Sequence, residues 1–250
     1  MIAAGFTDVG LSRKHNQDAI FVSAEEVGPL PNLFIVADGM GGHNAGDVAS
    51  SRAIETIVDY VSNFRAGDLV QPDDYLDLLI NAAQRANDAI FSEGIDSIEK
   101  KGMGTTLTLC VINELKILVV HIGDSRAYRV TSSSIEQITT DHTYVEELIQ
   151  ARRISKEQAK THPRRHVVTK VLGTKGPCGA DGLVVPSADT KAVLLCSDGL
   201  SNMLDNETIL RIINSAGSPS ARALTLIGEA NLKGGYDNIS AIIIDFKEVS

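Results

Sequence analysis

Five aspartates stand where predicted strands begin or end, and this placement is the first indication of chemistry in the sequence. They are Asp38, Asp124 and Asp198, each after an apolar run, and Asp18 and Asp237, each before one. Any one of them fits an ordinary turn, because Asp-Gly is favourable turn chemistry. Strand ends on one edge of a sheet sandwich meet in space, however, and converging carboxylates repel one another unless a cation lies between them. The five together therefore predict a cation site.

Oxygen ligands without a supporting Cys or His cluster select hard cations, so we expect Mg²⁺ or Mn²⁺ in preference to Ca²⁺. A cluster this acidic can hold two ions roughly 4 Å apart and bridge them with a water or hydroxide, which is a nucleophile for phosphorus. Gly39 directly follows Asp38 and would let a backbone carbonyl bend in as a further oxygen ligand. The predicted chemistry is metal-dependent hydrolysis of a phosphate ester.

Two basic residues lie close in sequence to these carboxylates. Arg13 precedes Asp18 by five residues, and a planar guanidinium binds phosphate as a bidentate donor. His43 follows Asp38 by five residues and could protonate the leaving oxygen. A lone arginine is usually a surface residue and a lone histidine usually structural. Their closeness to the carboxylate segments favours the catalytic interpretation of both.

Composition narrows the class of protein. The net charge of −9 over 250 residues argues against general nucleic-acid binding. No apolar run approaches the roughly 18 residues of a membrane span, and the first residues lack the pattern of a signal peptide, so we expect no membrane association. Cys110, Cys178 and Cys196 are odd in number and far apart. This favours reduced cysteines in a core, and with them a cytoplasmic location.

The elements that must position these residues are mostly strands. Apolar runs predict strands at 2–8, 20–23, 33–37, 105–112, 115–122, 126–130, 192–196 and 239–246. Only Asn113 and Glu114 separate the fourth run from the fifth, which forces an antiparallel hairpin. A tight turn at 123–125 then leads into the next run, which indicates a meander.

Helical periodicity occurs in separate blocks. It predicts helices over 46–63 and 72–93, with Gly94 ending the second. Near the end of the chain, Ser218 opens a further helix that the glycines at 234–235 close. Antiparallel strands with helices in separate blocks indicate an α+β fold, not a doubly wound one.

Residues 141–180 differ from the rest in charge. They contain eight Lys or Arg and four Asp or Glu, a net charge of +4 in an acidic chain. We interpret them as a helical insertion, or flap, on the sheet core. Whether this basic surface faces a substrate or is simply solvated stays open at this point.

Eight segments recur in the order typical of one known family. They are TDVGLSRKHNQD, FIVADGMGGHNAG, GMGTTLTL, VVHIGDSRAYR, ITTDHTYVEELI, THPRRHVVTKVLG, LLCSDGLSNML and GGYDNISAII. Together they cover about residues 5 to 245. On these motifs the chain resembles the metal-dependent protein phosphatases (PPM, or type 2C), most closely the compact bacterial serine/threonine phosphatases. The resemblance implies one domain over residues 1–250. It also implies a four-layer α-β-β-α sandwich of two antiparallel sheets flanked by helices, with a small helical flap at about 141–186.

The resemblance also assigns metal ligands. By motif match, Asp38 bridges two ions, Mn²⁺ or Mg²⁺, and the Gly39 carbonyl binds one of them. Asp198 and Asp237 bind the other. Asp18 acts through metal-bound water. These roles follow from the family's motifs and not from spacing alone.

The remaining roles concern a third ion and the substrate. Asp124 matches the residue that helps hold a third, weaker ion. Arg13 matches the phosphate-binding arginine and His43 the general acid. One departure is Gln17, where many eukaryotic members carry a glutamate; a neutral amide there should soften metal affinity.

The expected function is hydrolysis of phosphoserine and phosphothreonine in proteins, by attack of the bridging hydroxide with no phosphoenzyme. The implied partners are phosphorylated proteins and a cognate serine/threonine kinase, and the expected state is a monomer. Two alternatives keep the fold: a phosphatase for a small phosphate ester, and a non-catalytic phosphoprotein-binding domain.

Two other classes fit the sequence poorly. A serine hydrolase built on Ser125 would need a late catalytic histidine, and none follows His166. The glycines at 39–42 lack the last glycine of a dinucleotide fingerprint, and no Gly-Lys-Ser/Thr follows them.

Overall fold

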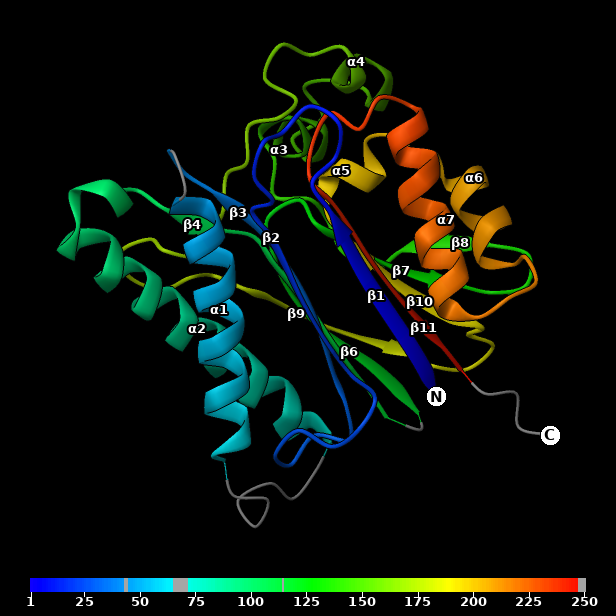
Figure 1. Cartoon of the computed structure of the whole chain (residues 1–250), viewed down its shortest axis with the longest axis horizontal. Coiled ribbons are helices and arrows are strands. Elements are labelled where there is room, and N and C mark those ends of the chain that lie inside the picture. The colour runs from blue at the N-terminus through cyan, green and yellow to red at the C-terminus, as the bar shows by residue number, and fades with distance from the viewer. Residues whose placement is uncertain (43–44, 65–71, 114, 247–250) are drawn as a thin grey trace.

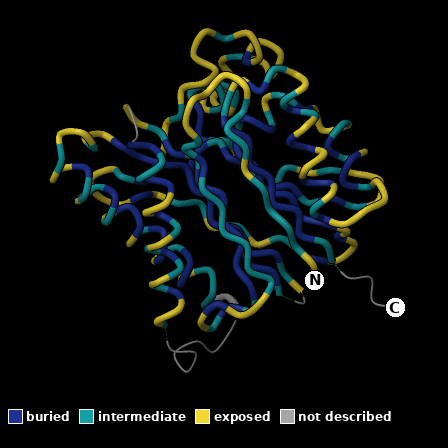
Figure 2. Tube along the Cα trace, viewed as in Figure 1, coloured by how far each residue is buried: buried dark blue, intermediate teal, exposed yellow. Residues whose placement is uncertain are grey.

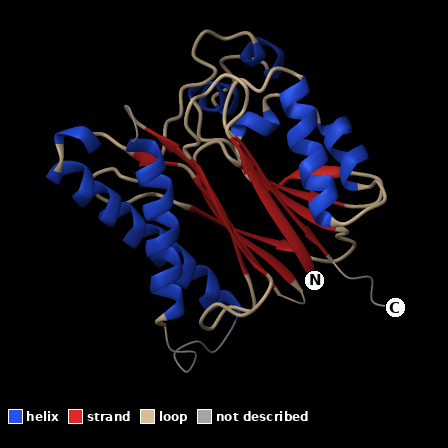
Figure 3. Ribbon diagram, viewed as in Figure 1, coloured by secondary structure: helices blue, strands red, loops and turns tan. Residues whose placement is uncertain are grey.

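Two antiparallel sheets lie face to face between two layers of helices in the computed structural model (Figures 1 and 3). The structure describes residues 1–42, 45–64, 72–113 and 115–246. This is an α+β fold, as the patterns predicted, and it is the four-layer α-β-β-α sandwich that the family resemblance implied. No helix within those residues is long and apolar enough to cross a bilayer.

The first sheet has six strands and carries Asp18 and Asp38. Its order is β2-β3-β5-β6-β9, with β4 paired to β3. The strands are β2 Asp18–Ser23, β3 Leu33–Met40, β4 Gly104–Thr105, β5 Leu107–Ile112, β6 Lys116–Ile122 and β9 Asp181–Pro186. Strands β5 and β6 pair antiparallel as the predicted hairpin, with Leu107 opposite Ile122. The central strands are apolar on both faces because helices cover one face and the second sheet covers the other.

The second sheet has five strands in the order β1-β11-β10-β7-β8. These are β1 Ile2–Asp8, β11 Ile239–Asp245, β10 Ala192–Cys196, β7 Arg126–Val130 and β8 Ile135–Gln137. The two ends of the chain thus lie side by side in β1 and β11, with Ile2 opposite Asp245 and Asp8 opposite Ile239. This pairing brings the segment after β1 next to the segment before β11, where Arg13 and Asp237 lie.

Helices cover the outer face of each sheet. On the six-stranded sheet lie α1 Ala45–Ser62 and α2 Pro72–Asp96, followed by the 3-10 helix η2 Ile98–Lys100. On the five-stranded sheet lie α6 Asn206–Ile213 and α7 Pro219–Leu232. The short helices are α3 Tyr144–Gln150, α4 Lys156–Lys160 and α5 Asp198–Ser201. As predicted, Ser218 caps α7, because its side chain accepts the Ala221 amide.

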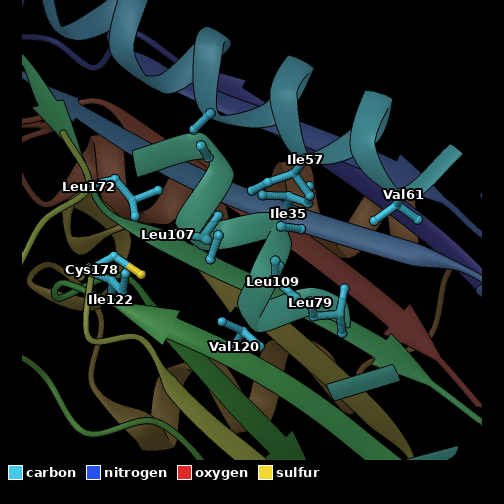
Figure 4. Packing of buried hydrophobic residues seen from close by; sticks show 14 of the residues in the cluster. Ile35, Ile57, Val61, Leu79, Leu107, Leu109, Val120, Ile122, Leu172 and Cys178 are labelled. Carbon is cyan, nitrogen blue, oxygen red and sulfur yellow. The ribbon is translucent and has the colours of Figure 1, made fainter. Parts of the chain in front are cut away.

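The buried residues form three apolar layers, which appear as dark segments along both sheets in Figure 2. Figure 4 shows the layer under α1 and α2, where Ile57 of α1 and Leu79 of α2 lie over Ile35 and Leu109 of the sheet. Between the sheets, Phe34 and Cys110 belong to the same cluster as Ile242. Cys178 and Cys196 are also buried, and all three cysteines are free, as predicted.

The predicted meander is wrong. Strand β6 ends in the six-stranded sheet and β7 begins in the five-stranded sheet, so residues 123–125 cross from one sheet to the other. Gly123 makes this crossing at φ +107°, a conformation that favours glycine. A fully apolar strand carries no local sign of which sheet it joins, since it is buried on both faces in either one.

Two further boundaries differ from expectation. Gly94 lies inside α2, which runs on to Asp96; burial of the apolar face of α2 outweighs the cost of one glycine. Residues 181–186, which the predicted flap included, form edge strand β9 paired with β6, and the inserted segment therefore ends before Asp181.

Candidate functional site

The five aspartates come together at one end of the sandwich, where Asp198 begins α5. Four of them line a cavity of about 450 Å³, together with Arg13, Gln17 and Gly39: Asp38, Asp124, Asp198 and Asp237. The fifth, Asp18, is the cross-strand neighbour of Asp38 in the β2–β3 ladder. The predicted convergence of strand-end carboxylates is thus found in the structure.

Asp38 is held by its backbone. Its amide donates to Thr106 Oγ1 at 3.0 Å, and its carbonyl accepts from the Thr106 amide and from Thr105 Oγ1, each at 2.9 Å. The adjacent Gly39 is needed for a close approach, because a Cβ there would lie 1.9 Å from the carbonyl oxygen of Gly46 in the first turn of α1. This contact leaves the Asp38 side chain at the cavity while α1 begins directly behind it.

Asp18 is a buried carboxylate with one satisfied oxygen. Its Oδ2 accepts from Ser197 Oγ at 2.8 Å and from Ser240 Oγ at 2.6 Å. Its Oδ1 is buried without a hydrogen-bond partner. Burial, reinforced by the charges of Asp198 and Asp237 and opposed by the two hydroxyls, raises the pKa of Asp18 to about 7.

The neighbouring carboxylates also have raised pKa values. Burial, together with the charge of Asp18, raises the pKa of Asp38 well above its ordinary value. Burial also raises the pKa of Asp124 to about 7, with Asp198 adding to the shift. Asp198 has a raised pKa for the same reason, and its Oδ1 is buried without a partner while Oδ2 accepts from Asn202. Only added positive charge would let all these groups ionise together.

Arg13 and Asp237 form an ion pair at the rim of the cavity, with Nη2 of Arg13 2.8 Å from Oδ2 of Asp237. Asn238 fixes the segments around them. Its Nδ2 donates to the carbonyls of Val9 and His15, and its Oδ1 accepts the Gln17 amide. Arg13, which is predicted to bind phosphate, therefore contacts Asp237, which is predicted to bind metal.

The donor atoms at this site determine which cations it could hold. Across the described part of the chain, no three His, Cys, Asp or Glu side chains stand close enough to form a ready-made ligand set. The donor chemistry nevertheless fits hard cations: all five acidic side chains offer oxygen, and two buried oxygens, Asp18 Oδ1 and Asp198 Oδ1, have no partner. A cation would also offset the burial and the mutual repulsion that together raise the carboxylate pKa values.

A second cavity, of about 640 Å³, lies between the inserted segment and α5. It shares Asp124, Asp198 and His166 with the first cavity. Arg165 of the inserted segment lines it, whereas the guanidinium of Arg164 lies 3.4 Å from the centre of the Tyr144 ring. The basic residues of the inserted segment are thus divided: Arg165 lines the cavity, and the exposed Arg164 packs on Tyr144 of the segment itself.

Some functional candidates were not found by sequence reasoning. His166 lines both cavities, Ser197 and Ser240 hold Asp18, and Asn238 organises the rim. Part of the signal was present, since Ser197, Asn238 and Ser240 lie within three residues of Asp198 or Asp237. His43, the predicted general acid, lies outside the described residues.

Comparison with known proteins agrees with this geometry. A sequence profile described as protein phosphatase 2C matches residues 12–226. The serine/threonine phosphatase stp of Listeria welshimeri is 36% identical over 241 residues, which cover 96% of this chain and 93% of that protein. A crystal structure of a bacterial serine phosphatase superposes with a TM-score of 0.92 at 31% identity, covering 100% of this chain and 99% of that one.

A further neighbour carries the metal. The catalytic domain of the serine/threonine protein phosphatase PstP, solved with two manganese ions, superposes with a TM-score of 0.81 at 32% identity and covers 98% of this chain and 97% of its own. The α-β-β-α sandwich with acidic residues at one end thus defines a metal-dependent phosphatase. The chain belongs to the protein phosphatase 2C family.

Proposed function

We propose that this protein is a serine/threonine phosphatase that removes phosphate from phosphorylated proteins, with Mn²⁺ or Mg²⁺ as cofactor. One observation carries the proposal: four aspartates from separate segments line one cavity and Asp18 lies opposite one of them in the sheet. Two of the buried carboxylate oxygens have no hydrogen-bond partner among the described residues. Membership of the protein phosphatase 2C family supports the same activity.

Six residues of this chain would hold the ions. They are Asp18, Asp38, Gly39, Asp124, Asp198 and Asp237, with Gly39 contributing its carbonyl oxygen. Bound there, two cations would neutralise phosphate charge and activate the attacking water, and Asp124 would serve a third, weaker ion. Ser197 and Ser240 orient Asp18 by occupying its Oδ2, which leaves Oδ1 available.

The substrate's phosphate would be held by Arg13. Its guanidinium is half exposed at the rim of the cavity. When substrate binds, the guanidinium would donate to phosphate oxygens, in place of Asp237 or in addition to it. Since Asn238 anchors the segments on each side, Arg13 approaches the phosphate from a fixed backbone. His43 is proposed, on its motif, to protonate the departing serine or threonine oxygen.

The substrates are proposed to be phosphoproteins that a cognate serine/threonine kinase produces. Arg165 at the second cavity would contact acidic residues beside the phosphoresidue. We further propose that the protein acts as a monomer, because this chain alone lines both cavities, and that it acts in the cytoplasm, where its three free cysteines would stay reduced.

The first experiment is phosphate release from a phosphothreonine peptide in the presence of Mn²⁺ and again with EDTA. We expect release that stops with EDTA and returns when Mn²⁺ is restored. p-Nitrophenyl phosphate is the matched small substrate. Hydrolysis of that ester without hydrolysis of the peptide would assign the protein to small phosphate esters, and no hydrolysis of either by folded protein would indicate a binding domain.

A further inference from the structure

His142 connects the base of the inserted segment to the turn that carries Asp124. Its backbone amide donates to the Gly123 carbonyl at 2.7 Å, and the Gly123 amide donates back to His142 Nδ1 at 3.1 Å. Its own carbonyl accepts from the amide of Thr169, on the returning side of the inserted segment, at 2.8 Å. Both polar groups of the Gly123 backbone are therefore bound by one residue.

The hydrogen bonds also determine the form of the imidazole. A backbone amide always donates, so Nδ1 of His142 must carry a lone pair. Nε2 lies 3.1 Å from Oδ2 of Asp181, and a carboxylate accepts, so Nε2 carries the proton. Lys170, with Nζ 3.3 Å from Nε2, donates instead to Asp181 Oδ1 and the Gly179 carbonyl.

The ring stays neutral in this environment. Burial, with Lys170 adding to it, lowers the pKa of His142, although Asp181 and Asp141 oppose the shift. The imidazole of His121 stacks on the ring with centroids 5.0 Å apart. A neutral ring of one tautomer is the form that can accept the Gly123 amide.

The opposite side of the same turn is fixed by two threonines: Thr106, which directly precedes β5, and Thr108 within β5. Ser125 Oγ lies 2.8 Å from Thr106 Oγ1, and the Ser125 carbonyl accepts from Thr108 Oγ1 at 3.0 Å. Thr106 is also the residue that binds the Asp38 backbone. Residues 123–125 are therefore tied to Asp38 on one side and to His142 on the other.

We propose that His142 is a positioning residue for cation binding at Asp124: its Nδ1 holds the Gly123 amide and so fixes the Asp124 carboxylate relative to Asp198. Glycine adopts the φ of +107° at Gly123 without strain and is equally free to leave it, so the hydrogen bonds hold the turn and loss of this acceptor frees it. The inference rests on the proposed metal role of Asp124.

The test is titration of the metal-free protein with Mn²⁺ by calorimetry, with hydrogen exchange of the Gly123 amide as a second readout. His142→Leu keeps the bulk of the ring and removes the acceptor. We expect it to weaken by about 10-fold the same Mn²⁺ step that Asp124→Asn weakens, and to speed exchange at Gly123. His142→Asn places an amide oxygen near the position of Nδ1 and should stay within about 3-fold of the unmodified protein.

The matched control is His162→Leu. His162 belongs to the same inserted segment, and its Nδ1 also accepts a backbone amide, that of Arg164, at 3.1 Å. We expect no change in Mn²⁺ binding for this variant. If His142→Leu does not fold, His142→Gln replaces it, because the longer side chain reaches toward Nε2 and leaves the Gly123 amide without an acceptor.

The outcomes distinguish the metal role of Asp124 from the positioning role of His142. Unchanged Mn²⁺ binding in Asp124→Asn would overturn the metal role of Asp124 and this inference with it. If Asp124→Asn weakens the Mn²⁺ step but His142→Leu binds Mn²⁺ like the unmodified protein, the positioning role alone is overturned. The same holds if His142→Gln and His142→Asn bind Mn²⁺ equally well.

Discussion

At the residue scale, the site holds carboxylates whose charges are costly without a cation. Asp38 is affected by all four of the other aspartates, and burial is the main cause of its raised pKa. Asp18 keeps a buried oxygen without a partner although two serines bind the other oxygen. Ordinary packing would place apolar or paired side chains here, so the arrangement favours cation binding over stability.

The substitution Asp38→Asn separates cation binding from the stability of the metal-free protein. We expect phosphatase activity to fall by more than the roughly 100-fold that loss of an outer-shell contact costs, because a proposed bridging ligand is lost. In EDTA at pH 8 the variant should melt a few degrees higher than the unmodified protein, because one buried charge is removed. Peptide hydrolysis and thermal unfolding measure the two effects.

A suitable control for that experiment is Asp59→Asn, since Asp59 is exposed on α1 and its side chain accepts a hydrogen bond from Asn63, one turn further along the helix. It should change neither measurement. Full activity of Asp38→Asn would contradict the metal assignment. A lower melting temperature in EDTA would contradict the account of the buried charge.

At the element scale, the junction between β3 and α1 decides where Asp38 lies. The backbones of Gly39 and Gly46 approach so closely that a Cβ on either would overlap the other segment. The side-chain amide of Gln17 packs against Gly46, which ties the start of β2 to the same junction. Gly39 and Gly46 therefore have a packing purpose beside the one predicted from chemistry.

Two alanine substitutions in this stretch test that purpose. Gly39→Ala should lower the free energy of unfolding by about 1–3 kcal/mol, because the new methyl group meets the Gly46 backbone. Gly42→Ala is the matched control, since a Cβ there meets nothing within 4 Å among the described residues, and we expect a change within about 0.5 kcal/mol. Urea unfolding gives both values, and equal destabilisation by the two would rule out the close approach as the reason for Gly39.

At the scale of the whole molecule, the sandwich assembles its site from the two ends of the chain. Ser197 and Ser240, which hold Asp18, lie 179 and 222 residues from it in sequence. The pairing of β1 with β11 brings Arg13 to Asp237 in the same way. Stability of the entire fold is therefore linked to the protonation of the site.

The linkage has a definite sign in the metal-free protein. Asp18 and Asp124 have pKa values of about 7 in the folded state against 3.8 ordinarily, so the folded state binds more protons between those values. Their stabilising contribution is complete below pH 4 and is lost as pH rises through 7. The buried imidazoles of His121 and His142 act oppositely at lower pH, because their pKa values are lowered from 6.5. The interval from pH 6.5 to 8.5 isolates the carboxylates.

Urea unfolding in EDTA should thus show a free energy of unfolding that falls across this interval. Mn²⁺ should restore more stability at pH 8.5 than at pH 6.5, since protons no longer compete for the carboxylates. Asp18→Asn should flatten the fall. A free energy that stays constant or rises with pH would contradict the raised pKa values.

The sequence by itself determined much of this protein. Apolar runs located β1, β7 and β10 to the residue, and the short connection after Ile112 forced the β5–β6 hairpin, although β6 begins one residue later than predicted. Motifs identified the four aspartates that line the cavity and Asp18 beside them. These features depend on patterns within about ten residues of one another, where periodicity and turn chemistry act directly.

Only the tertiary structure decided how those pieces meet. It put β6 and β7 in different sheets, made residues 181–186 an edge strand, and brought His142 to the Gly123 turn. It also showed which oxygen of Asp18 is satisfied and which is free. A strand buried on both faces fits either sheet, and the ionisation of a carboxylate depends on burial and on charges far away in sequence. Packing of the whole chain therefore sets both.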